Sequence, residues 1–260
     1  MTRAKRNPLT GIYTPAFSGG AAAFSPDDLA NLQEWLDFSD VTTLWTDSAR
    51  SDQVDADGDV IGYMDDKSGN GNDVLQATTA KKGIYKVNIQ NSLAIGRWDG
   101  GDDALAGSAI SAFDGDFTAF WVSKEIGDIG TPFSSDDTAN DKFASYHHIG
   151  SPYYLGTYDP SVGDTKLVVA DGATSADFYV FALQVDGTSF TGYRNGTLQA
   201  DSHTISGSVP NTTFLVGAQQ DGVLGVFDGD LAEILVYSAA LSSADITQVN
   251  NYLLAKWGVS

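Results

Sequence analysis

The sequence predicts an all-β fold, and its composition supplies the evidence. Of the 34 acidic residues only Glu34, Glu125 and Glu233 are Glu, and the others are Asp. Glu favours helix interiors, whereas Asp competes for backbone hydrogen bonds and prefers turns. The chain also has 28 Gly, and Asp-Gly or Asn-Gly pairs recur between short apolar runs. Many turns between short apolar segments are typical of antiparallel β-structure.

The first 24 residues are expected to form an extended docking arm that is not part of the core. They are rich in Gly, Pro and Ala, and they hold Arg3, Lys5 and Arg6 without a following apolar segment. We therefore expect no secretory signal. The arm would dock on a partner chain, and residues 25–260 would form one domain, which this length allows.

Two helices are expected at the ends of that domain. Ser25 and Pro26, followed by two Asp, are typical of a helix start and predict about two turns. At the other end, Ser242 is the expected cap of a helix that stops at Gly258. An apolar stripe at helical spacing runs along this second helix: Ile246, Val249, Leu253 and Trp257.

Strands and turns are expected to alternate between these helices. The segment 178–185 is apolar at nearly every position, which predicts a central strand that is covered on both faces. Asn195-Gly196 predicts a type I′ hairpin between 190–194 and 197–199. The polar segment 127–141 is expected to be a mobile loop. The other expected strands are 33–38, 117–124, 214–217 and 231–237.

An ordered set of short motifs then resembles a laminin-G-like domain of the concanavalin A-like lectin/glucanase family. The motifs are 35–40, 58–59, 65–72, 98–105, 193–196, 227–242 and 254–258. The resemblance covers about residues 30–258 and implies a jelly-roll β sandwich of two antiparallel sheets. A Pro/Gly-rich arm before one such domain is similar to virion surface proteins of tailed bacteriophages. That similarity implies capsid decoration, a head fibre or a tail fibre.

Charge and chain composition narrow the function further. The net charge of −20 argues against binding nucleic acid or anionic membranes, because phosphate groups need a basic face. The lack of Cys excludes disulfides and Cys-based metal sites. No apolar run reaches the ~18 residues of a membrane span, so no membrane insertion is expected.

Catalysis is not expected from this sequence. Glycosidases of this fold use carboxylate pairs, and here no two Glu lie near each other in the sequence. His203 is isolated from any Ser-His-Asp arrangement. We therefore expect no catalytic residue, although Asp residues that are distant in sequence leave a carboxylate pair open.

Metal binding is not required, and calcium is the one ion that the acidic clusters suggest. Residues 55–59 miss the EF-hand pattern because Val60 stands where Gly is needed, so an Asp-Gly turn is favoured. His147 and His148 are adjacent and face opposite ways on a strand, so a zinc site would need a partner from elsewhere. The weak calcium candidates are Asp99, Asp102, Asp103, Asp136, Asp137 and Asp141.

A carbohydrate site is the more specific hypothesis. Aromatic rings cover the apolar face of a sugar while hydroxyl and carboxylate oxygens bind its polar groups. A cluster that we call the tyrosine patch has this chemistry, although Tyr also packs well on ordinary sheets. It consists of Tyr146, His147, His148, Tyr153, Tyr154 and Tyr158. Among the Trp residues, Trp45 alone sits at a loop edge, where a core or a surface role is open.

The sequence thus favours a noncatalytic virion surface protein, made in the host cytoplasm. Other virion proteins would be its partners through the arm, cell-surface glycans would be its ligands, and it would assemble as a homo-oligomer or in many copies. An extracellular bacterial carbohydrate-binding or adhesion module is the alternative. A glycoside hydrolase or lyase is the least favoured.

Overall fold

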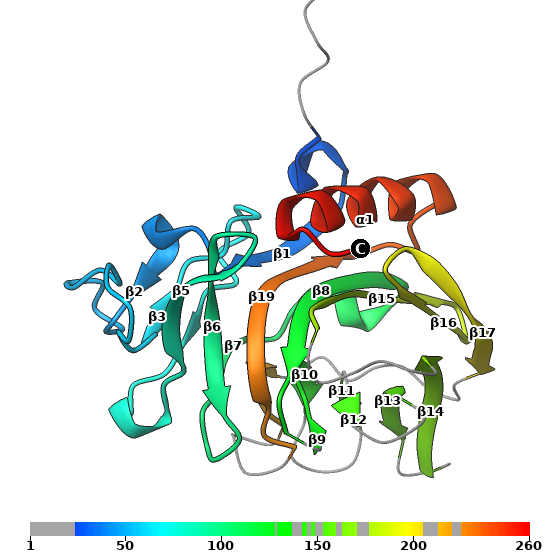
Figure 1. Cartoon of the computed structure of the whole chain (residues 1–260). Coiled ribbons are helices and arrows are strands. Elements are labelled where there is room, and N and C mark those ends of the chain that lie inside the picture. Colours follow the sequence, from blue (N-terminus) through cyan, green and yellow to red (C-terminus); the bar gives the residue numbers. More distant parts are fainter. Residues whose placement is uncertain are drawn as a thin grey trace, which may run out of the picture.

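The computed structural model describes residues 24–127, 129–136, 142–144, 147–148, 153–159, 163–170, 177–204, 213–219 and 225–260. Within them, two antiparallel sheets stack face to face, and a helix covers the outside of one sheet (Figure 1). We name the sheet under the helix sheet A and the other sheet B. This arrangement confirms the predicted all-β sandwich.

Sheet A has the strand order β17-β16-β15-β8-β19-β6-β5, with β1 paired to β19. Its longest pairing joins β8 to β19. The turn between β16 and β17 is the one that the sequence predicts at Asn195-Gly196. Asn195 and Gly196 both have positive φ, as a type I′ turn requires. Its strands are β1 (Leu32–Asp37), β5 (Ile84–Gln90), β6 (Leu93–Asp99), β8 (Phe117–Glu125), β15 (Tyr179–Asp186), β16 (Ser189–Arg194), β17 (Thr197–Thr204) and β19 (Asp228–Tyr237).

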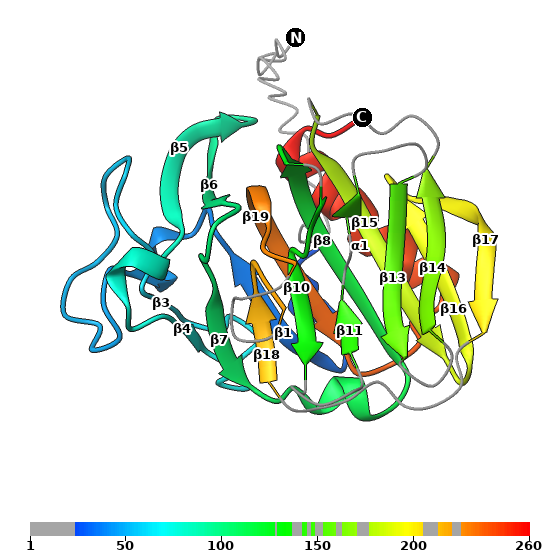
Figure 2. The same cartoon turned by 90° about the horizontal axis from the view of Figure 1, so that it is seen from below.

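Sheet B has the order β14-β13-β11-β10-β18-β7-β4-β3-β2, and β9 pairs with β12 in a separate small sheet. Figure 2 shows sheet B from its outer side. Its strands are β2 (Leu44–Trp45), β3 (Tyr63–Met64), β4 (Val74–Leu75), β7 (Leu105–Ser108), β10 (Phe133–Asp136), β11 (Lys142–Ala144), β13 (Tyr153–Asp159), β14 (Gly163–Ala170) and β18 (Thr213–Val216); the small sheet has β9 (Ile129–Gly130) and β12 (His147–His148).

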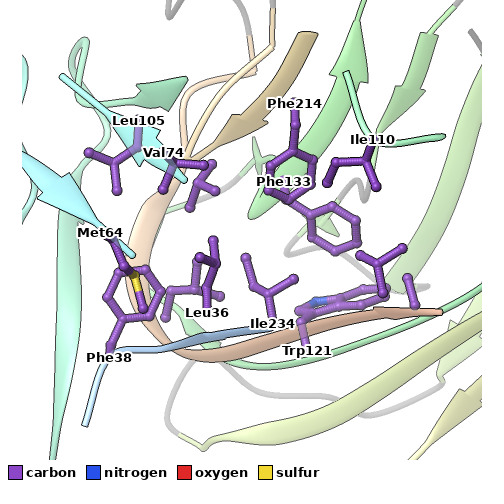
Figure 3. Packing of buried hydrophobic residues seen from close by; sticks show 14 of the residues in the cluster. Leu36, Phe38, Met64, Val74, Leu105, Ile110, Trp121, Phe133, Phe214 and Ile234 are labelled. Carbon is purple, nitrogen blue, oxygen red and sulfur yellow. The ribbon is translucent and has the colours of Figure 1, made fainter. Parts of the chain in front are cut away.

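The main core fills the space between the two sheets. Strand β15 sends Phe181 and Leu183 into this core, while Val180 and Ala182 pack on the other side against the helix layer. The prediction that this strand is covered on both faces is therefore confirmed. Figure 3 shows side chains of both sheets meeting, among them Ile234 and Trp121 from sheet A and Phe133 and Phe214 from sheet B.

The C-terminal helix α1 (Ser243–Trp257) agrees with the sequence. The Ser242 hydroxyl accepts a hydrogen bond from the Asp245 backbone N–H at 3.2 Å, and Gly258 ends the helix with φ of 62°. The predicted apolar stripe is buried throughout. Burying these side chains against sheet A, rather than helix propensity alone, is what stabilises a helix of this length.

Two local expectations were wrong. The predicted two-turn helix at residue 26 is a single 3₁₀ turn, Pro26–Asp28. It stops early because Asn31 takes a left-handed φ of 70° and Leu32 already belongs to β1. The predicted mobile loop 127–141 contains β10, whose Phe133 is fully buried in the main core. The sequence does not reveal this strand because the residues after Phe133 are polar. Ser134 and Ser135 are nevertheless buried.

Candidate functional site

The strongest sequence motifs converge on one buried group of charges beneath α1, which we call the ion cluster. It consists of Asp37 on β1, Lys67 after β3, Glu233 on β19 and Lys256 on α1. Lys256 Nζ lies 2.8 Å from both carboxylates, and Lys67 Nζ lies 2.9 Å from Asp37. Segments far apart in the sequence are therefore joined by one network.

Glu233 is the most enclosed member of the ion cluster. Its carboxylate accepts hydrogen bonds from Trp257 Nε1 at 2.7 Å, Trp35 Nε1 at 2.8 Å and the Tyr252 hydroxyl at 3.0 Å, besides the Lys256 contact. Burial and Asp37 raise the pKa of Glu233, while Lys256 and Trp257 lower it. The net effect is a pKa above the ordinary value for Glu, because burial is the largest cause. The four donors bind the ionised form and offset only part of the cost of burying it.

Asp37 shows how closely the cluster balances charge. Burial alone would raise the pKa of Asp37, but Lys256 and Lys67 outweigh it and hold the pKa below its ordinary value. Lys256 thus ties α1 to Asp37 on β1 and to Glu233 on β19, while Lys67 also pairs with Asp40 at 2.7 Å. We assign the ion cluster a structural role, since each of its charges is already paired within the protein.

The first acidic cluster lies at the rim of the sandwich, at the end of β6. The Asp99 carboxylate accepts a hydrogen bond from the Gly101 backbone N–H at 2.8 Å, which closes the turn after β6. Burial, together with the charge of Asp99, raises the pKa of Asp103 to about 6. Asp228, which the sequence analysis missed, pairs in register with Asp99 across β6 and β19. Asp102 instead faces Lys81 at 3.6 Å.

Among the described side chains, no group of three or more His, Asp or Glu residues is arranged to hold a metal ion. Asp136 is described only as a backbone position on β10, and Asp137 and Asp141 lie outside the described residues. In the segment 55–59, the Asp59 carboxylate accepts hydrogen bonds from the backbone N–H groups of Asp55 and Ala56. This confirms the predicted Asp-Gly turn.

The three Glu residues of the chain are all buried. Glu34 and Glu233 have no exposed surface and Glu125 has 3%. Glu233 is bound by its four donors, and Glu34 stands on β1 two residues before Leu36, which lies in the main core. A carboxylate pair that cleaves a polysaccharide must reach its substrate. These Glu side chains therefore do not form such a pair at the surface.

The strand register of sheet B places the tyrosine patch. Directly opposed residues of antiparallel strands share a face, and successive residues alternate. Phe133 belongs to the main core, so Ser134 lies on the opposite face, which we call the outer face. Ser134 pairs with Ala144, and Ala144 pairs with Gly156. Tyr154 and Tyr158, two residues to either side of Gly156, therefore lie on the outer face.

The remaining members of the patch divide differently. Tyr153 falls on the core side of β13, because it immediately precedes Tyr154. His147 and His148 lie on β12 and pair with Gly130 and Ile129, outside sheet B. Tyr146 lies outside the described residues. The register thus puts Tyr154 and Tyr158 on the same face of β13, about 13 Å apart along the strand, and Tyr153 on the other face. Strand β12, which carries the two His residues, lies against β13.

The same outer-face row continues to the far end of sheet B, at β2. From Ser134 it passes through Leu215 and Ala106 to Leu75, Tyr63 and Trp45. Ser134 and Leu215 are buried, so the middle of the row is covered.

We call the far end the Trp45 surface. The sequence analysis singled out Trp45 but missed its companions Arg50, Tyr63, Asp65, Asp73 and Leu75. The Arg50 guanidinium lies 4.3 Å from the centre of the Tyr63 ring. Burial, and then Asp73, raise the pKa of Tyr63 to about 12, so Tyr63 stays neutral. Alternation of core and surface residues along β2 and β3 could have identified these companions in the sequence. However, each of these strands has only two residues, which is too short for the alternation to be recognised.

A hollow of about 640 Å³ opens at another rim, between the start of β8, the end of β15 and the segment after β19. Asp116 and Asp186 lie at its edge, and small residues line the rest. None of the residues predicted as sites from the sequence lines it.

In the part of the chain that is described, no helix is long and apolar enough to cross a membrane.

Comparison with solved structures shows the same fold in several proteins. Domain 4 of AbnA, an extracellular arabinanase of Geobacillus stearothermophilus solved with arabinotriose, is 14% identical, with a TM-score of 0.61 over 85% of this chain and 98% of that domain. The binding domain of Paraclostridial Mosquitocidal Protein 1 is 15% identical, with a TM-score of 0.60 over 88% of this chain and 53% of that one. The receptor-binding domain of botulinum neurotoxin D is 15% identical, with a TM-score of 0.59 over 90% of this chain and 56% of that one.

Comparison of sequences gives the family directly. No curated protein matches the chain. A family model described as the concanavalin A-like lectin/glucanases superfamily, of the laminin G type, matches residues 99–247. This stretch is more than half of the 260 residues, and it includes all of β8, β15 and β19, the centre of sheet A. The chain therefore belongs to the concanavalin A-like lectin/glucanase superfamily.

Proposed function

We propose that this chain is a noncatalytic carbohydrate-binding protein displayed on the surface of a bacteriophage virion. The observation that carries the binding proposal is the register of β13, which puts Tyr154 and Tyr158 on the same outer face of sheet B, about 13 Å apart along the strand. Two aromatic residues at this spacing on one sheet face suit successive rings of a glycan chain, each stacked on one Tyr. Asp164 pairs with Tyr158, and Lys166 pairs with Gly156, so polar residues flank the platform.

The buried Glu residues support binding without cleavage. Retaining and inverting glycosidases both need two carboxylic acids that flank the bond to be cleaved. Here Glu34 and Glu233 have no exposed surface. Domain 4 of the arabinanase, a sandwich of the same fold, was solved with a bound arabinose oligosaccharide, which supports carbohydrate as the ligand class.

Mutation of the outer-face tyrosines tests the binding site. Tyr154→Ala combined with Tyr158→Ala is expected to reduce binding to host-envelope polysaccharides at least about tenfold, because stacking is lost. The melting temperature is expected to change by only a few degrees. Binding is measured on an array of such polysaccharides. The control is Leu198→Ala, which removes an exposed apolar side chain from β17 of sheet A. Equal binding by the double variant and the control would contradict the site.

The virion proposal rests on the arm and on the charge of the chain. Its first six residues hold three basic side chains in a chain of net charge −20. The described chain is anchored from Phe24 onward, where Phe24 packs edge-to-face on Tyr252 and the Tyr237 hydroxyl donates to the Pro26 carbonyl. The expected arm ended at residue 24, but Phe24 is packed on α1, so residues 1–23 are the segment that we propose fastens the domain to another virion protein.

Deletion of residues 1–23 tests this role. The shortened protein is expected to melt within a few degrees of the full chain, because the deletion retains Phe24 and its contacts. It is also expected to be missing from particles assembled in infected cells, as measured by immunogold electron microscopy. Normal labelling of particles by the shortened protein would contradict docking through the arm. Labelling of cell surfaces, with none on particles, would favour an adhesion module.

A further inference from the structure

The Trp45 surface has the features of a second sugar contact, at the opposite end of the outer face from the tyrosines. Trp45, Tyr63 and Leu75 are directly opposed across β2, β3 and β4. Their neighbours Leu44, Met64 and Val74 are fully buried in the main core, so the strand alternation turns the first three residues outward. The sheet therefore fixes where each of them stands.

Arg50 forms a flat cover over Tyr63. Its guanidinium contacts the ring face, and its Nη atoms lie 2.8 Å from Asp65 and 2.8 Å from Asp73. It also donates to the Tyr63 hydroxyl, which in turn donates to Asp73. An Arg held at its edge by carboxylates cannot rotate away, so one face of the guanidinium plane is held toward solvent. Its side chain is 44% exposed.

Trp45 is held beside this plane by the same carboxylate. Its Nε1 donates to Asp65 Oδ2 at 2.8 Å, while the other Asp65 oxygen faces Arg50. The ring is half-buried, whereas Trp35, Trp98, Trp121 and Trp257 are buried. Leu75, which lies beyond Tyr63 on the next strand, is 40% exposed. A half-buried indole, a guanidinium plane over Tyr63 and an exposed apolar side chain thus follow one another across β2, β3 and β4.

The loop that carries Arg50 is built for this position. Asp47 accepts hydrogen bonds from the Ala49 backbone N–H at 2.7 Å and from the Ser51 hydroxyl at 2.6 Å. Arg50 itself has φ of 56°, a left-handed conformation that costs a non-Gly residue free energy. The contacts with Tyr63, Asp65 and Asp73 are what offset that cost.

Charge identifies the ligand class. The single positive charge of Arg50 is met by two carboxylates, so the Trp45 surface carries one net negative charge. The whole chain carries −20. Such a surface repels sulfated, phosphorylated and carboxylated glycans. The carboxylate oxygens retain lone pairs that accept hydrogen bonds from hydroxyl groups.

We propose that the Trp45 surface binds a ring of a neutral glycan, which stacks on Trp45 and the Arg50 plane and donates hydroxyl hydrogen bonds to Asp65 and Asp73. This inference rests on the proposed carbohydrate-binding function and adds a second contact and a charge class to it.

Tryptophan fluorescence tests this inference, because Trp45 is the most solvent-accessible of the five Trp residues. The probes are three neutral polysaccharides, namely dextran, mannan and galactan, with polygalacturonate as the anionic counterpart. At least one neutral polysaccharide is expected to shift the emission to shorter wavelength and to protect it from acrylamide. Trp45→Phe, which keeps a ring, is expected to bind without the shift. Trp45→Ala is expected to bind about tenfold more weakly than the native protein.

Matched variants separate this inference from the proposed function. Leu198→Ala is the surface control, and melting curves show that each variant is folded. Native affinity in Trp45→Ala, together with loss of affinity in Tyr154→Ala/Tyr158→Ala, would overturn the Trp45 surface and leave the proposed function standing. A response to polygalacturonate alone would overturn the neutral class. Absence of binding to any host-envelope polysaccharide on the array would overturn the proposed function and this inference together.

Discussion

Replacement of Lys256 by Met is expected to lower the free energy of unfolding by about 3–5 kcal/mol, since it leaves buried charge unpaired. Lys256 is the cation closest to the fully buried Glu233, and it shares Asp37 with Lys67. Met fills a similar volume, so loss of packing is not the cause. Urea unfolding followed by far-ultraviolet circular dichroism measures the change.

The same substitution at the surface provides the control. Lys81 and Asp102 also form an ion pair, at 3.6 Å, but both side chains are at least one third exposed. Exposed pairs of this kind contribute roughly 0–1 kcal/mol, so Lys81→Met is expected to have a small effect. Similar losses in the two variants would show that the ion cluster does not hold α1 on sheet A.

Replacement of Glu34 by Gln is expected to stabilise the protein at pH 8 by about 1–3 kcal/mol, because Glu34 must take up a proton when the chain folds at this pH and Gln need not. Glu34 is fully buried, and neither of its carboxyl oxygens has a hydrogen-bond partner. Burial, followed by the charges of Asp66 and Asp73, raises its pKa well above 4.5. The folded protein therefore keeps Glu34 protonated to a higher pH than the unfolded chain does.

The sign of the pH dependence follows from linkage. Because the pKa of Glu34 is higher in the folded chain, its contribution to stability is complete below about pH 4.5 and declines as pH rises. The stability difference between Glu34→Gln and the native protein is expected to grow from pH 4.5 to pH 8. Asp37 and Asp103 titrate in both proteins, so their effects cancel in the difference. Melting curves across this range measure it, and a difference independent of pH would contradict the assignment.

Local sequence signals predicted the elements whose structure depends on local chemistry. The α1 helix has its cap at Ser242, its stop at Gly258 and a stripe at helical spacing. The hairpin at Asn195-Gly196 needs only positive φ at two positions. In these cases the residues that specify the element lie within it.

Elements that depend on distant partners could not be predicted in the same way. Strand β10 is stabilised by β18 and β11, and its Ser residues are buried because other segments cover them. The predicted two-turn helix after Ser25 is cut short because Leu32 pairs with Tyr237 on β19 and so belongs to a strand. Tertiary pairing outweighs local propensity in both places.

The candidate sites follow the same division. The sequence identified Tyr154 and Tyr158 as part of an aromatic cluster, but only the register separates them from Tyr153. Asp228 meets Asp99 across two strands, and Arg50 meets Tyr63 from a loop. A single sequence contains no record of such contacts between segments, so the Trp45 surface could be recognised only in the folded chain.

The most direct test of the account is to incubate the purified full chain with host-envelope polysaccharides and to measure binding and released reducing ends in the same samples. Saturable binding to at least one neutral polysaccharide is expected, with no increase in reducing ends. Release of reducing ends that scales with protein concentration, or no binding to any polysaccharide, would contradict the proposal of a noncatalytic carbohydrate-binding protein.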